Sequence, residues 1–177
     1  MTPKHSKTPF TVYDTLAVVV LIVFGTLFQD ACPPFAFGQA KPQFLTAIVI
    51  YYAWTRPFSV AFPVAIVCGV LQNGLGSLPN GASVVLMLGV MLFCTRFAKH
   101  QLPDRLASCV ILAIALAPVL TGLEYVLMRI SGRIPEMRYM FIGSRVVWSI
   151  LLAAPVCVAT LLAARLLGAF AAQGNQE

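Results

Sequence analysis

The sequence predicts an all-helical polytopic membrane protein, a compact bundle of about six transmembrane helices joined by short loops. Of its 177 residues, 59% are hydrophobic and 10% are charged, whereas a soluble domain is about half apolar and a quarter charged. The stretches 15–29, 82–95 and 106–123 contain no charged side chain. Since a helix needs about 20 apolar residues to cross the hydrocarbon core, this composition excludes disorder, collagen, a disulfide scaffold and a soluble enzyme.

The first predicted span covers residues 13–29. It follows a start that carries Lys4 and Lys7, as a secretory signal sequence would. No small-x-small cleavage pattern comes after it, and Gln29 stands where a lipoprotein signal ahead of Cys32 has leucine or a similar residue. We therefore expect this segment to remain as an uncleaved membrane helix.

The second predicted span, residues 42–54, is short for a crossing. Its end carries Tyr51, Trp54 and Arg56, aromatic and basic side chains that are typical of the water interface of a membrane. A helix that starts a few residues before Pro42 would be long enough to cross. The alternative is a re-entrant or strongly buried short helix.

Four further spans are predicted from apolar runs that are separated by turns rich in proline and glycine. They cover residues 59–78, 81–95, 106–128 and 141–168. Proline inside a helix kinks it, so we expect kinks at Pro63, Pro118 and Pro155. Because no loop is long enough to fold alone, residues 1–177 form a single transmembrane domain.

The net charge of +6 resides mostly at the ends of the spans, a pattern that indicates membrane topology and lipid contact and argues against nucleic-acid binding. With the N-terminus cytoplasmic, seven basic residues fall on the inner side and five on the outer side. This bias favours placing both termini in the cytoplasm.

Glu124 is the charged residue that falls clearly inside a predicted span, and charge in the bilayer is costly. Arg129 and Arg145 are its candidate partners, and an ion pair with Arg145 would join the last two spans. A proton relay or a substrate-binding carboxylate is the alternative. Gln72 and Asn73 lie deep in the third span, where carboxamides either join helices by hydrogen bonds or contact a ligand or partner.

Small residues recur at every fourth position in the last two spans. The rows are Ala113, Ala117 and Thr121, then Ser149, Ala153 and Cys157. Such rows form close helix contacts in lipid, either within one chain or with the single helix of another protein.

Nothing in the sequence suggests a reaction centre. The five cysteines are scattered with no CxxC pair, and neither His5 nor His100 has a second ligand at metal-binding spacing. There is no nucleophile with a base and no pair of carboxylates, so we expect no catalytic, cofactor or metal site. Two classes remain, a small transporter or substrate-capture subunit and a non-catalytic scaffold. The scarcity of charge inside the spans favours the scaffold.

Several residues in the first half of the chain follow a family pattern. They are Pro42 in Pro42-Gln43-Phe44-Leu45, then Tyr51, Pro57, Gly69 and Gly81. In this order and spacing they resemble the bacterial rod shape-determining protein MreD family. The family typically has an aspartate four residues after the glycine that matches Gly69, whereas this chain has Asn73. A charge-dependent role of that position is therefore in doubt here, while a role in hydrogen bonding would be kept.

The resemblance implies a component of the cell-wall elongation complex that maintains rod shape in the cytoplasmic membrane. Proteins of this family are thought to associate with MreC, the actin-like MreB, the glycosyltransferase RodA and a penicillin-binding transpeptidase, and to have no reaction of their own. Their fold is similar to the substrate-binding subunits of energy-coupling-factor vitamin transporters. A vitamin-capture subunit is therefore the alternative function.

Overall fold

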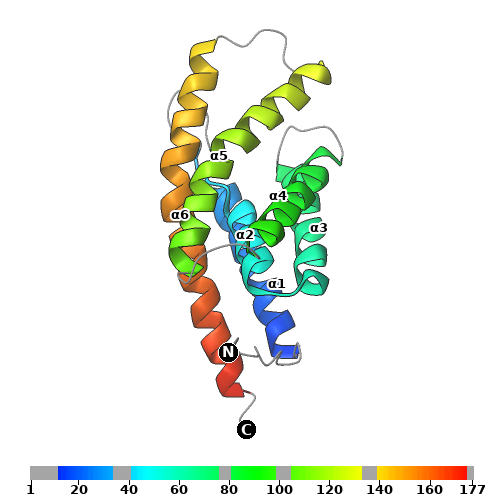
Figure 1. The fold of residues 1–177 in the computed structure, drawn as a ribbon, viewed down its shortest axis with the longest axis vertical. Helices are drawn as coiled ribbons and strands as arrows, with labels where there is room; N and C mark the ends of the chain where they lie inside the picture. The colour runs from blue at the N-terminus through cyan, green and yellow to red at the C-terminus, as the bar shows by residue number, and fades with distance from the viewer. Residues whose placement is uncertain (1–11, 34–40, 76–80, 99–104, 133–138, 175–177) are drawn as a thin grey trace.

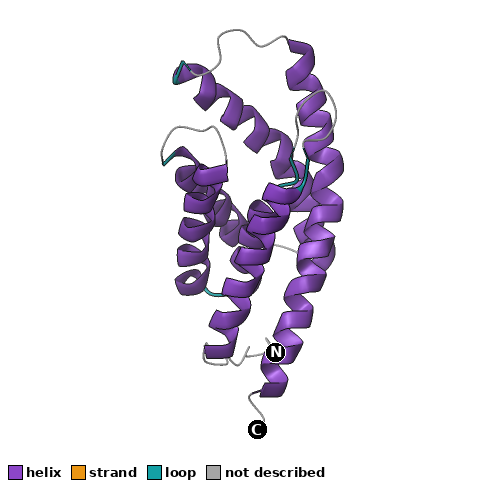
Figure 2. Cartoon of the chain, turned by 180° about the vertical axis from the view of Figure 1, so that it is seen from behind, coloured by secondary structure: helices purple, strands orange, loops and turns teal. Residues whose placement is uncertain are grey.

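The computed structural model of the chain describes residues 12–33, 41–75, 81–98, 105–132 and 139–174. All regular structure within these ranges is helical, as the sequence predicts, and it forms one elongated bundle (Figures 1 and 2). The six helices are α1 (Val12–Ala31), α2 (Phe44–Thr55), α3 (Phe58–Leu75), α4 (Ala82–Ala98), α5 (Arg105–Ile130) and α6 (Tyr139–Gly174).

Helix α2 lies at the centre of the bundle and contacts each of the other five helices. Most of its side chains are buried on every side, as expected for a helix that is hydrophobic all round. Its 12 residues give a length of about 18 Å, well below the roughly 30 Å of a hydrocarbon core. The protein therefore contains a short helix that is covered by its neighbours.

The expectation that this helix begins before Pro42 is wrong. Residues 41–43 are not helical, and α2 begins at Phe44. The physical reason lies in Lys41-Pro42, because a proline ring disfavours helical backbone angles at the residue that precedes it. The alternative of a buried short helix describes α2 correctly.

Three helices have stretches that are long and apolar enough to cross a membrane, namely Phe58–Leu75, Ala107–Ile130 and Ile142–Leu167. The other apolar stretches in the described residues, Thr15–Ala31, Phe44–Thr55 and Ala82–Phe97, are shorter. The six predicted spans thus correspond to six helices, and within the described side chains three of these contain an apolar stretch of spanning length. Helix α6 extends beyond the predicted end at residue 168, because alanine-rich sequence continues to favour a helix there.

The outer faces of the helices carry many large apolar side chains. Leu16 on α1, Val85 on α4 and Ile130 on α5 are each more than 60% exposed, and similar residues occur on α3 and α6. Soluble monomers rarely expose apolar surface this extensively. Together with the three long apolar helices, this surface suggests a membrane protein.

Candidate functional site

Gly69 lies at a close contact between α3 and α4. A Cβ atom at this position would stand 2.6 Å from the Cα of Val84 and 3.2 Å from the carbonyl oxygen of Ser83. Both of these are backbone atoms, which cannot move aside as the tip of a side chain could. Gly69 therefore allows the two helices to pack backbone against backbone, as small residues do at helix contacts in lipid.

Asn73, one turn further along α3, caps the start of α4. Its Oδ1 accepts a hydrogen bond of 3.2 Å from the backbone N–H of Ser83, which lies in the first turn of α4. The first N–H groups of a helix have no partner within the helix, so this carboxamide satisfies one of them. Gly81 precedes the helix with a φ of +88°, a backbone conformation that glycine adopts without strain.

Gln72 joins α3 to α1 through a second carboxamide, Gln29. The Nε2 of Gln29 donates a hydrogen bond of 2.6 Å to the Oε1 of Gln72. The Oε1 of Gln29 in turn accepts a bond of 3.3 Å from the backbone N–H of Leu45, in the first turn of α2. One buried side chain thus links three helices and caps the central one.

The remaining residues of the family pattern also lie at helix ends or in packing positions. Pro42 is buried just ahead of α2. Tyr51 is half-buried, and its ring meets that of Tyr52 edge to face at 5.2 Å between centroids. The carbonyl oxygen of Pro57 accepts the backbone N–H of Ala61 at 3.1 Å and so begins α3. Among the pattern residues, Gly69 and Asn73 thus make the contact between α3 and α4, and Pro42 and Pro57 lie just ahead of α2 and α3.

Glu124 on α5 and Arg145 on α6 lie next to each other, with 3.6 Å between Glu124 Oε2 and Arg145 Nη2. Arg129, the other predicted partner, is exposed in the last turn of α5. The Glu124 side chain is 12% exposed and that of Arg145 is 31% exposed. This contact joins the two helices near the C-terminus of α5 and the N-terminus of α6.

The two rows of small residues face each other inside the chain. Ala113 and Ala117 of α5 and Ser149 and Ala153 of α6 line one cavity at the contact with α2. In α5 the row is buried, so it is occupied by the chain's own helices. Of the two alternatives, a contact within one chain describes these rows, because α5, α6 and α2 of the same chain meet there.

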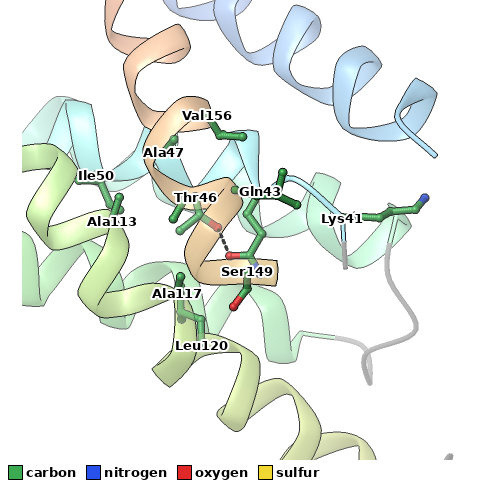
Figure 3. Close-up of a pocket in the computed structure, with 12 residues that line it drawn as sticks. Lys41, Gln43, Thr46, Ala47, Ile50, Ala113, Ala117, Leu120, Ser149 and Val156 are labelled. Carbon is green, nitrogen blue, oxygen red and sulfur yellow. Dashed lines mark hydrogen bonds between the residues drawn. The ribbon is translucent and has the colours of Figure 1, made fainter. Parts of the chain in front are cut away.

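This cavity between α2, α5 and α6 is small, with a volume of about 30 Å³. Figure 3 shows Gln43, Thr46 and Ser149 around it, whereas the side chain of Lys41 points away. The hydroxyl of Thr46 lies 3.5 Å from Gln43 Oε1. A volume of this size suits about one water molecule, so the cavity is too small for a substrate.

A larger groove of about 460 Å³ lies between α1, α2 and α6. Its walls are almost entirely apolar and include Phe24 and Phe28 of α1 and Ala163 of α6. Thr160 is the polar residue among them, and its hydroxyl donates to the carbonyl oxygen of Val156 in the preceding turn. The groove thus provides an apolar surface whose one polar side chain has its hydroxyl donor already bonded within α6.

No three His, Cys, Asp or Glu side chains gather at a possible metal site within the part of the chain that the structure describes. Cys68, Cys94, Cys109 and Cys157 are free and buried, while Cys32 is half-buried. His5, His100, Arg133 and Arg138 lie outside the described residues.

The sequence did not reveal the role of Gln29. A carboxamide near the end of an otherwise apolar helix is the signal that could have drawn attention to it, because such a group needs a partner in lipid. Comparisons of the chain with models of protein families, with curated proteins and with solved structures find no match.

Proposed function

We propose that the chain is a non-catalytic membrane scaffold of the bacterial cell-wall elongation complex. In this proposal it maintains rod shape by binding an MreC-like protein and other elongation proteins, among them MreB, RodA and a penicillin-binding transpeptidase. All six helices lie in the cytoplasmic membrane, in a bundle similar to that of energy-coupling-factor substrate-binding subunits. Both termini face the cytoplasm.

The observation that carries this proposal is where the family-pattern residues lie. Gly69, Asn73 and Gly81 set the contact between α3 and α4, and Pro42 and Pro57 lie at the starts of α2 and α3. Neither these residues nor Tyr51 line the small cavity or the apolar groove. A pattern that specifies a rigid bundle rather than a pocket supports a scaffold.

The apolar groove between α1 and α6 is the surface best suited to a membrane partner. Phe24 and Phe28 stack at 6.5 Å between centroids on one side, and Ala163 lines the groove on the other. Rigid aromatic side chains beside small residues provide a contact surface for an apolar helix. The exposed Arg129 at the end of α5 suits an acidic surface outside the hydrocarbon.

The proposal is tested by depleting the protein in its bacterial host, which should round or swell the cells. Complementation of the depleted cells with Ala163→Phe, which fills the groove, should fail to restore rod shape. The control is Leu151→Phe, which also places a phenylalanine on α6 but at a side chain that is 58% exposed and outside the groove. Affinity purification should recover the MreC-like protein with the control and much less of it with Ala163→Phe. Normal cell shape after complete depletion would contradict the proposal.

A vitamin-capture subunit has less support in the described residues. Small-molecule pockets measure about 300–1,000 Å³ and carry a few well-placed polar groups. The cavity with polar groups is about 30 Å³, and the groove of adequate volume has an apolar lining. A rise in melting temperature with any member of a vitamin panel would revive this alternative.

A further inference from the structure

The ion pair between Glu124 and Arg145 leaves most of its hydrogen-bonding capacity unused. The two side chains meet at 3.6 Å, which is longer than a hydrogen bond, and neither makes another polar contact within the described ranges. A guanidinium offers five N–H donors, and a carboxylate offers about four acceptor positions. Among the described residues, the pair therefore has donors without partners on one side and acceptors without partners on the other.

Both residues lie near the boundary between hydrocarbon and lipid head groups if α5 and α6 cross the membrane. Helix α6 begins at Tyr139, so Arg145 is about 9 Å along the helix axis from its start. Helix α5 ends at Ile130, about 9 Å beyond Glu124. Long charged side chains reach several ångströms toward the interface from such positions.

At this end of the bundle, α5 and α6 diverge in both views (Figures 1 and 2). Burying an ion pair costs several kcal/mol per ion unless further hydrogen bonds satisfy the charges. A ligand that brings an anion and a hydrogen-bonding cation a short distance apart would provide both missing sets of partners. A zwitterionic lipid head group with a phosphate and a primary ammonium has this chemistry.

We propose that Glu124 and Arg145 bind the head group of phosphatidylethanolamine. The lipid phosphate accepts hydrogen bonds from the guanidinium of Arg145, and the ammonium donates to the carboxylate of Glu124. This inference rests on the membrane location in the proposed function, but it does not depend on the role in cell-wall elongation.

The exposure of the two side chains predicts which lipids are discriminated. Arg145 is 31% exposed, whereas Glu124 is 12% exposed, so the guanidinium is easier to reach than the carboxylate. A primary ammonium is compact and has three N–H donors. The trimethylammonium of phosphatidylcholine is larger and has no N–H, and phosphatidylglycerol has no amine. The site should therefore favour phosphatidylethanolamine over both.

Native mass spectrometry of the full chain in detergent, with the three lipids carrying identical acyl chains, tests this. We expect phosphatidylethanolamine to bind about tenfold more tightly than phosphatidylcholine, equivalent to about 1.4 kcal/mol. Glu124→Gln should remove this preference, and Arg145→Gln should weaken binding of phosphatidylethanolamine and phosphatidylglycerol alike. Arg129→Gln, a loss of charge at an exposed arginine on α5, is the control and should leave the preference unchanged.

A series on the unaltered protein keeps the test independent of how well the variants fold. Adding one, two and three methyl groups to the ammonium should lower the affinity stepwise. Equal affinity across this series would overturn the proposal, and so would a preference that survives Glu124→Gln. Equally tight binding of free phosphoethanolamine would also overturn it, because the site would then recognise a soluble zwitterion. If depletion changes cell shape but the protein shows no lipid preference, only the lipid-binding inference is refuted. If the protein prefers phosphatidylethanolamine but depletion leaves cell shape unchanged, only the proposed scaffold role is refuted.

Discussion

Replacing Gly69 with alanine tests the close contact between α3 and α4 directly. The added Cβ would lie 2.6 Å from the Cα of Val84, a separation that forces one helix to shift. Overpacking of this kind costs about 1–3 kcal/mol. For a chain of this length, that corresponds to a melting temperature lower by about 2–12 °C. Intrinsic fluorescence of Trp54 and Trp148 during heating in detergent measures the change.

Gly89→Ala on α4 is the matched control, because a Cβ at Gly89 would have no atom within 4 Å. Alanine favours a helix more than glycine does, so this variant should be more stable by about 0.4–1 kcal/mol. The melting temperature should rise by about 1–4 °C. If Gly69→Ala melts as high as Gly89→Ala, the backbone contact does not constrain the fold and the interpretation of Gly69 is wrong.

Three further results are expected from the polar contacts and the cysteines. Gln29→Ala leaves the buried N–H of Leu45 unpaired and should cost about 1–3 kcal/mol; an unchanged melting temperature would show that the bond contributes nothing. Asn73→Ala should lower the free energy of unfolding by about 1 kcal/mol through loss of the cap on α4. Asn73→Asp keeps the acceptor oxygen and should retain most of that stability; equal losses of stability in the two variants would exclude capping. A water-soluble maleimide should label Cys32 in the folded protein and reach the four buried cysteines only after denaturation. Cys32→Ser is the control, and prompt labelling of this folded variant would show that the other four cysteines are not buried.

The helices could be predicted because each apolar run is bounded by prolines, glycines or charged residues. α5 begins and ends within about two residues of the predicted 106–128. At α2 the composition alone could not decide between a crossing and a buried helix, because a central helix and a lipid-facing helix are equally apolar. The difference lies in what surrounds α2, which is a tertiary property.

In the candidate site too, some contacts could be predicted from the sequence and others depend on the tertiary structure. The proximity of Glu124 and Arg145 could be anticipated, because a short loop joins their helices and a buried charge is stabilised by an opposite charge beside it. The bond from Gln29 to Gln72 spans 43 positions in the chain, and no local pattern specifies such a pair. The rows of small residues show that spacing identifies a helix contact without identifying the partner, which here is the chain itself.

Two carboxamide side chains bond backbone N–H groups in the first turns of buried or closely packed helices. Leu45 in the first turn of the short helix α2 is fully buried, and an unsatisfied backbone group is costly in such a place. Gln29 supplies an acceptor at the start of α2, and Asn73 does the same for α4. Changes at these positions should lower the amount of folded protein before they affect any partner. Partner binding must therefore be judged from variants in the apolar groove, such as Ala163→Phe, measured at equal amounts of folded protein.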